Sequence, residues 1–289
     1  MENILVAAKN NSQSLEEIFE KLEPSQFQEF LAFLEAKKEF SVTLLKGLIK
    51  VKEIDLSKLK VKPSFCAVLE TGEYKNGWQV SPANPESHFG KFAEQRKTFD
   101  LTFEDGEKFK YLALTAGTLG VPFWGDFTLV FDPNKFDNTE YAALRYNSLR
   151  KSIDGLTHYY FDGKKVDLKK LEKDLAEPDN LKRLAVIKLE KEITQVAPKD
   201  YPKTLLRELK GDHRDYIEVI AWKKLKLEDC LSAIRFKKSY YVLIENAIQK
   251  AFRTKNGDVL GESYQNLSEL NKLLVHYKKN KDIKLDLIE

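Results

Sequence analysis

The spacing of apolar residues near the N-terminus predicts two amphipathic helices. The two apolar stripes consist of Leu15, Ile18, Phe19 and Leu22, and of Phe27, Phe30, Leu31 and Leu34. Residues three or four apart share one face of a helix. Ser14 with Glu17, and Ser25 with Gln28, match the capping box that begins a helix, and a proline separates the two pairs. We expect helices from residue 14 to about 50, forming a small subdomain packed on a larger body, or a partner-binding arm.

From residue 64 onward, short apolar runs typical of strands replace the helical spacing. These runs are SFCAVLETG, KFKYLALTAG, DFTLVFDP and DYIEVIAWKKL, and GWQVSP is a second short strand or a loop. Helical periodicity returns at 166–195, and two further helices are expected at 239–252 and 264–279. The order predicts the α+β class, with a β-rich centre, a helical insertion and helices at both ends.

The charge balance and composition narrow the classes of function. The 289 residues include 48 basic and 45 acidic side chains, for a net charge of +3. This balance gives no strong field, so we expect no dedicated nucleic-acid binding. No apolar run is long enough for a membrane helix, and no secretory signal is visible at the N-terminus. We therefore expect a soluble protein, cytoplasmic or secreted into a host cell without a classical signal peptide. Two cysteines and four scattered histidines predict neither a disulfide framework nor a metal site.

Two segments in the first half of the chain contain candidate ligand-binding residues. Thr71 and Gly72 end an expected strand, where a glycine lets a ligand approach the backbone closely, although a plain hairpin explains them too. The second segment is His88-Phe89-Gly90 followed by Arg96. The planar guanidinium of Arg96 suits a phosphate, but a solvated surface arginine is the alternative.

Two later segments contain the remaining candidates. Arg145, Tyr146 and Ser148 follow an expected strand and form either the rim of a ligand site or a surface turn. Glu218 lies within an apolar strand, where a buried acid must be paired or used in chemistry. The alternative is an edge-strand glutamate that points into water. The common nucleotide-binding and hydrolase motifs, such as a Walker A loop, G-x-G-x-x-G and G-x-S-x-G, are not present in the sequence.

Taken in order, these segments resemble the mono-ADP-ribosyltransferase superfamily. The resemblance rests on the strand expected to end at Gly72, the Y-x-A-L and GDFTLVFDP block, RYNS, and YIEVIAW leading into KLKLEDCLSAI. It extends to a bacterial subgroup and to secreted effector transferases of intracellular bacteria. It implies a split β-sheet core at residues 61–236 with a helical insertion at about 163–200. A helical region at 1–60 and C-terminal helices at 237–289 complete the expected organisation.

The resemblance also implies an activity and a set of site residues. NAD is the expected co-substrate, and its ADP-ribose is transferred to a side chain of a target protein, such as a host enzyme. Glu218 is the catalytic residue that holds the nicotinamide ribose, and Ser148 orients it. The residues expected to bind NAD are Thr71 and Gly72 at the nicotinamide amide, Arg96 or Arg145 at the pyrophosphate, and Tyr111, Tyr146 or Trp78 stacked on the nicotinamide ring.

The chain departs from the family pattern at two positions. Most members carry arginine or histidine just before the first glycine, where this chain has Thr71. Arginine-modifying members often carry a second glutamate two residues before the catalytic one, where this chain has Tyr216. Two alternatives therefore stay open, a non-catalytic protein-interaction module on the same fold and an NAD glycohydrolase.

Overall fold

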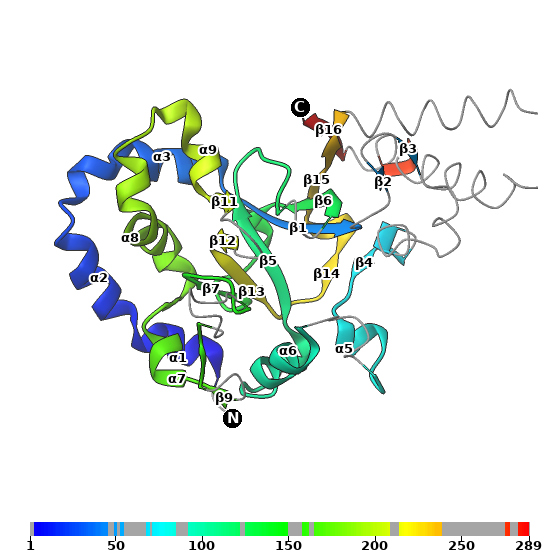
Figure 1. Cartoon of the computed structure of the whole chain (residues 1–289), viewed down its shortest axis with the longest axis horizontal. Coiled ribbons are helices and arrows are strands. Elements are labelled where there is room, and N and C mark those ends of the chain that lie inside the picture. Colours follow the sequence, from blue (N-terminus) through cyan, green and yellow to red (C-terminus); the bar gives the residue numbers. More distant parts are fainter. Residues whose placement is uncertain are drawn as a thin grey trace, which may run out of the picture. The chain divides into compact units, whose positions relative to one another are not determined.

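The structure is a computed structural model of the chain. It describes residues 3–45, 49–50, 53–54, 68–69, 71–84, 92–121, 125–149, 158–161, 165–208, 214–238, 275–277 and 283–288. The fold is mixed α/β, with several helices and a large, mostly antiparallel sheet (Figure 1). The expected mixture of helices and strands is thus confirmed, and the sheet is mostly antiparallel.

The chain divides into two compact units. Unit 1 comprises Met1–Phe40, Lys75–Thr118 and Pro133–Lys224. Unit 2 comprises Ser41–Tyr74, Leu119–Asp132 and Leu225–Glu289. Each unit is built from segments that are distant in sequence, so contacts between remote strands define it.

The strands of unit 1 place Glu218 at the centre of an antiparallel arrangement. The order is β10 (Leu175–Ala176), β7 (Tyr141–Leu144), β13 (Glu218–Ala221) and β5 (Lys110–Thr115). Glu218 lies opposite Leu144 on β7 and opposite Ala113 on β5. Because β13 has a neighbour on each side, Glu218 is on an internal strand, which rejects the edge-strand alternative.

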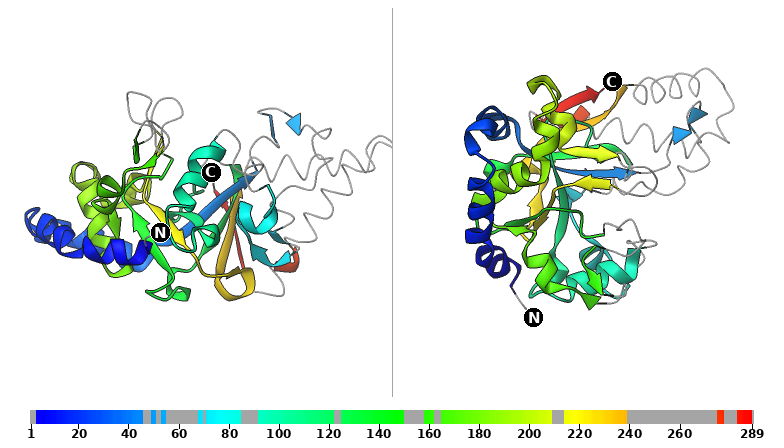
Figure 2. Two further views of the ribbon diagram at one scale, coloured as in Figure 1. Left: turned by 90° about the horizontal axis from the view of Figure 1, so that it is seen from below. Right: turned by 60° about the vertical axis from the view of Figure 1, so that its left-hand side comes forward.

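Helices surround these strands in unit 1. They are α1 (Ile4–Asn10), α2 (Ser12–Glu20), α3 (Gln28–Lys37), α5 (Gly77–Val80), α6 (Ala93–Asp100), α7 (Leu168–Glu172), α8 (Leu181–Ile193) and α9 (Tyr201–Thr204). Short 3₁₀ turns lie at Pro24–Phe27, Gly106–Lys108, Pro133–Lys135, Pro178–Asn180 and Pro198–Asp200. The short strand pairs are β8 (Tyr160–Phe161) with β9 (Lys165–Val166), and β11 (Leu206–Glu208) with β12 (Arg214–Tyr216). Both α2 and α3 pack against α8 (Figures 1 and 2), so the N-terminal helices belong to this unit.

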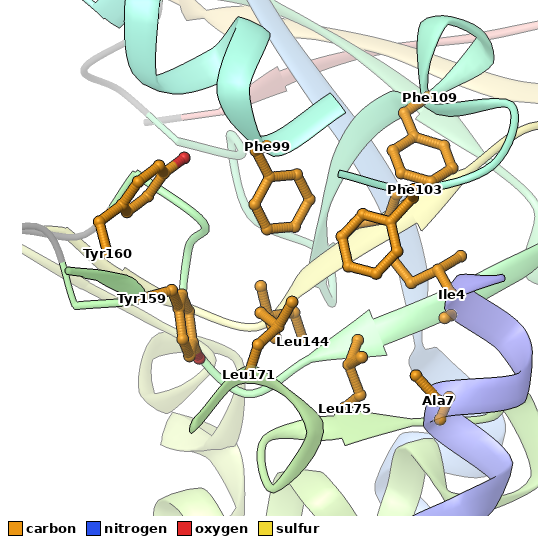
Figure 3. Packing of buried hydrophobic residues seen from close by; sticks show 13 residues of the cluster. Ile4, Ala7, Phe99, Phe103, Phe109, Leu144, Tyr159, Tyr160, Leu171 and Leu175 are labelled. Atoms are coloured by element: carbon orange, nitrogen blue, oxygen red, sulfur yellow. The ribbon is translucent and has the colours of Figure 1, made fainter. Parts of the chain in front are cut away.

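An aromatic cluster forms the core next to β7 and β13 (Figure 3). Its buried members are Ile4, Ala7, Ala8, Phe99, Phe103, Phe109, Ala142, Leu144, Tyr159, Tyr160, Leu171, Leu175 and Ile220. They come from α1, α6, α7, the strands and the loops between them. Burial of aromatic rings from remote segments holds α6 against the strands, which positions the polar residues of the same helix.

Unit 2 contains the other long strands. The order is β1 (Glu39–Leu45, in this unit from Ser41), β6 (Gly125–Phe131), β15 (Leu231–Lys237) and β16 (Lys284–Ile288). β15 is antiparallel to β6 and parallel to β16. Two short pairs join β2 (Ile49–Lys50) to β3 (Glu53–Ile54) and β4 (Glu73–Tyr74) to β14 (Leu225–Lys226). One short helix, α10 (Leu227–Cys230), precedes β15.

The structure confirms several predicted elements and corrects others. Strands at KFKYLALTAG, DFTLVFDP and DYIEVIAW are confirmed, the last with a break at Ile217. The two N-terminal helices are also confirmed, but β1 replaces the expected helix at 39–45. The helical stretch at 166–195 is interrupted by β10. The predicted helices at 239–252 and 264–279 lie outside the described residues except for 275–277, which are helical.

Helical backbone occurs in two segments with other expectations: the end of the strand expected at SFCAVLETG, and the strand or loop expected at GWQVSP. Val68, Leu69 and Thr71 have helical backbone, and the Gly72 N–H donates to the Val68 carbonyl at 3.0 Å. Gly72 itself has φ +67°, a left-handed conformation that suits glycine after a helical turn. In GWQVSP, Asn76 and Gln79 form a capping box that begins α5. In both places, local hydrogen bonds outweigh the strand-like composition.

None of the described helices is long and apolar enough to cross a membrane. The division into residues 1–60, 61–236 and 237–289 expected from the sequence stays a prediction.

Candidate active site

Glu218 is held at the start of β13 by the backbone of the loop that follows β7. The Ser148 N–H donates a hydrogen bond of 2.9 Å to Glu218 Oε2. The Glu218 side chain is only 1% exposed. β13 pairs with β7 in the register that sets Glu218 opposite Leu144, which brings Ser148 within reach. Strand pairing thus joins two candidates that lie far apart in the sequence.

Arg96, on α6, completes a buried trio with these two residues. Its Nη1 donates to Ser148 Oγ at 3.0 Å, and its Nη2 lies 3.8 Å from Glu218 Oε1. Arg96 and Ser148 are both buried. Within the part of the chain that the structure describes, Glu218 Oε1 has no hydrogen-bond partner. Glu218 Oε1 therefore faces the Arg96 guanidinium at 3.8 Å without accepting a hydrogen bond from it.

A second set of side chains lies next to Arg96. The Arg96 guanidinium carbon lies 3.3 Å from the centre of the Tyr111 ring, within the range of a cation–π contact. The Tyr111 hydroxyl donates to Asp100 Oδ1, and Trp78 Nε1 donates to Asp100 Oδ2 at 2.7 Å. Tyr111, which the resemblance placed among the nicotinamide-stacking candidates, thus has one ring face close to Arg96.

Burial raises the pKa of two carboxyl groups in this cluster, those of Glu218 and Asp100. Desolvation raises the pKa of Glu218, and the charge of Arg96 and the hydroxyls of Ser148 and Tyr216 lower it only in part. Desolvation likewise raises the pKa of Asp100 to about 6, against the opposing effect of Arg96. Raised carboxyl pKa values in the same cluster are a feature of functional sites, although structural networks also show them.

Arg145 and Tyr146 belong to a different cluster. Arg145 Nη1 lies 3.7 Å from Asp174 Oδ1, and Arg145 Nη2 donates to the Ile187 carbonyl at 3.2 Å. The Tyr146 ring packs edge-on against His158, with Lys188 Nζ 4.8 Å from its centre. Arg145 thus pairs with Asp174, and Tyr146 packs against His158, whose Nε2 lies 3.5 Å from Asp174 Oδ2.

The predicted nicotinamide residues Thr71 and Gly72 lie in unit 2. The Thr71 hydroxyl is 3.3 Å from both the Val68 and the Glu73 carbonyl oxygens. The Gly72 carbonyl accepts from the Leu227 N–H at 2.8 Å, and its own N–H is bonded to Val68. Both backbone groups of Gly72 are thus engaged within this unit. The assignment of these two residues to NAD binding stays a prediction, and His88 lies outside the described residues.

Sequence reasoning did not identify Asp100. Its position four residues after Arg96 was a usable signal, because residues at that spacing lie on one face of a helix. The hydrogen bond from Trp78 had no comparable signal, since α5 and α6 are brought together only by the fold.

The described residues contain no group of three or more histidine, cysteine, aspartate or glutamate side chains placed to hold a metal ion. The polar centre of unit 1 consists of the Glu218 and Asp100 carboxylates, the Arg96 guanidinium and the Ser148 and Tyr111 hydroxyls. A scan against protein-family models gave no match to this chain, and neither did a search of curated proteins.

Proposed function

We propose that the chain is an NAD-dependent mono-ADP-ribosyltransferase with Glu218 at its catalytic centre. The observation that carries the proposal is the geometry of Glu218: a buried carboxylate on an internal strand, with one oxygen hydrogen-bonded to Ser148 and the other facing Arg96 at 3.8 Å. In this proposal the strands belong to the split β-sheet core of that superfamily. The chain acts as a bacterial effector or toxin-like enzyme on a host protein.

The proposed reaction breaks the glycosidic C–N bond of NAD, and its electron pair leaves with nicotinamide. A lone pair of the acceptor side chain forms the new bond to the ribose carbon, and the acceptor loses a proton. Glu218 Oε1 accepts a hydrogen bond from a ribose hydroxyl, and the carboxylate stabilises the positive charge that develops on the sugar. Ser148 holds the other oxygen of Glu218 in place.

Arg96 has two roles in this proposal. It neutralises phosphate charge on the dinucleotide, for which its planar donor groups are suited. It also holds the Ser148 hydroxyl at 3.0 Å, so the same side chain links substrate binding to the orientation of Glu218. Positioning of this kind is the main contribution that a protein makes to a reaction with little covalent participation.

A non-catalytic interaction module is the second candidate, and the burial of the trio favours it. Glu218, Ser148 and Arg96 are 1%, 0% and 6% exposed. A satisfied structural network inside a binding scaffold has the same appearance. The two candidates differ in whether the protein binds and cleaves NAD.

Nicotinamide release from NAD, followed by chromatography, tests the proposal. The wild type is compared with Glu218→Gln and with Asp286→Asn, a matched variant that removes a carboxylate paired with a buried arginine in unit 2. We expect Glu218→Gln to lower the rate at least about 10²-fold and Asp286→Asn to retain it. Unchanged release in Glu218→Gln removes Glu218 from the mechanism.

Two further measurements separate the alternatives. Transfer of label from NAD to protein indicates a transferase, whereas free ADP-ribose as the only product indicates an NAD glycohydrolase. Calorimetry with NAD covers the case in which no release is seen. Absence of both binding and release supports the interaction module.

A further inference from the structure

Asp100 connects three elements of unit 1 next to the buried trio of Glu218, Ser148 and Arg96. It lies at the end of α6 and is 1% exposed. One carboxylate oxygen accepts from the Tyr111 hydroxyl on β5, and the other accepts from Trp78 Nε1 on α5. A buried carboxylate that is hydrogen-bonded through both oxygens constrains both of its donors.

The Tyr111 ring transmits this constraint to Arg96. The guanidinium carbon of Arg96 lies 3.3 Å from the ring centre, so movement of the ring moves the surface against which Arg96 rests. The guanidinium in turn donates to Ser148 and faces Glu218. The contacts therefore form one continuous path from Asp100 to the carboxylate of Glu218.

We infer that Asp100 is a positioning residue for the Glu218 centre, acting through Tyr111 to hold Arg96 in the orientation that reaches both Ser148 and Glu218. The consequence for catalysis rests on the proposed function, whereas the positioning of Arg96 does not. The same contacts assign Trp78 a different role, since it bonds to Asp100 and anchors α5.

The ionisation of Glu218 reports on the position of Arg96. Arg96 lowers the pKa of Glu218 from the value that burial alone would give. Displacement of Arg96 should therefore raise the pKa of Glu218 further, by about one pH unit or more, as expected for an opposite charge a few ångströms away. Asp100 and Glu218 face each other, and the other described groups that act on the ionisation of this pair are Arg96 on α6, Tyr111 on β5, Trp78 on α5, Tyr160 on β8, Tyr216 on β12 and Ser148.

A pair of matched variants separates positioning from simple packing. Tyr111→Phe and Trp78→Phe each remove one hydrogen bond to the same carboxylate, but only Tyr111 touches Arg96. The pKa of Glu218 is measured in each by carbon NMR of protein with labelled glutamate carboxyls, and Glu218→Gln identifies the signal. We expect the pKa of Glu218 to rise in Tyr111→Phe and to stay within about 0.3 pH units in Trp78→Phe.

Asp100→Asn gives an independent test through the sign of the change. Loss of a nearby negative charge would by itself lower the pKa of Glu218, whereas release of Arg96 raises it. The inference predicts a rise. A fall in Asp100→Asn, or equal behaviour of the two phenylalanine variants, overturns it and leaves Asp100 as an anchor of α5.

These measurements need no NAD, so they stand apart from a failure of the proposed function. Where NAD cleavage has been established, Tyr111→Phe should lower kcat/KM for nicotinamide release about 10-fold. The acid limb of its pH profile should move upward by the same interval as the NMR midpoint. A lower rate with an unmoved pH profile indicates a loss of packing and contradicts the positioning role.

Discussion

Two buried arginines, one in each unit, face carboxylates in different ways. In unit 1, Arg96 lies 3.8 Å from Glu218, and one Glu218 oxygen has no hydrogen-bond partner among the described residues. In unit 2, Arg235 Nε donates to Asp286 at 3.0 Å, and Lys284 adds a second cation at 2.9 Å. The two arginines are almost equally buried, at 6% and 5% exposed.

The carboxyl groups of the two pairs shift in opposite directions. Burial raises the pKa of Glu218 more than its partners lower it. For Asp286, burial also acts to raise the pKa, but the hydrogen bonds from Lys284 and Arg235 outweigh it and the pKa is lowered. The surroundings of Asp286 therefore favour its charged form, whereas burial disfavours the charged form of Glu218. The difference follows from burial and hydrogen bonding, because the Asp286 side chain is 12% exposed and bonded to two cations, whereas the Glu218 side chain is 1% exposed.

Removal of the arginine should show the largest difference between the pairs. Arg96→Met leaves Glu218 buried without its nearest cation, which should cost about 3–5 kcal/mol in the free energy of unfolding. Arg235→Met should cost less, because Lys284 still contacts Asp286. Urea unfolding at neutral pH measures both variants. Equal losses would show that the two pairs are equivalent.

The second-largest difference should appear in how the free energy of unfolding depends on pH, through Asp100 in unit 1 and Asp286 in unit 2. The pKa of Asp100 is raised to about 6, so the folded state binds its proton more tightly than the unfolded state. Stability from this group is present at acid pH and is lost as the pH rises from about 4 through about 6. The loss amounts to up to about 3 kcal/mol, because each pH unit between the ordinary and the raised pKa corresponds to about 1.4 kcal/mol.

Asp100→Asn should abolish the fall in the free energy of unfolding that Asp100 causes as the pH rises. The stability of this variant relative to the wild type should therefore improve between pH 4 and pH 7. Asp286→Asn should behave in the opposite way. Because the pKa of Asp286 is lowered in the folded state, this group stabilises the protein at pH values above the ordinary pKa of an aspartate. That contribution is lost as the pH falls through the lowered pKa. Urea unfolding at a series of pH values tests both signs, and parallel profiles for the two variants would contradict the prediction.

The smallest expected effect concerns the stability of Glu218→Gln. Burial disfavours the charged form of Glu218, and Arg96 keeps the Asp100 carboxylate nearby when Glu218 is replaced. The neutral isostere of Glu218 should therefore leave the melting temperature at neutral pH equal to or above that of the wild type. The free energy of unfolding should differ by no more than about 1 kcal/mol. A clear loss of stability would identify the trio as a structural network and favour the interaction module.

Local pattern was enough to predict several elements of the described chain, but it did not predict others such as α6, β7 and β15. Alternating or continuous apolar runs identified β5, β6 and β13, and helical spacing identified α2 and α3. It failed where hydrogen bonds within a few residues decide the conformation, as at Gly72 and at the Asn76–Gln79 capping box. It also missed β1, in which Phe40 and Val42 are buried at strand spacing.

Residue types alone indicated which side chains could carry chemistry, because charged and aromatic groups next to apolar strands are unusual enough to stand out. Glu218, Ser148 and Arg96 were candidates on that ground, and Tyr111 was added by the resemblance. Arg145 and Tyr146 were candidates as well. Only the tertiary structure separated the first four from the last two. Pairing of β13 with β7 brings Ser148 to Glu218, whereas the Arg145 N–H is bonded to the Asp174 carbonyl, just before β10. Strand order and register are set by contacts between remote segments, which no local pattern contains.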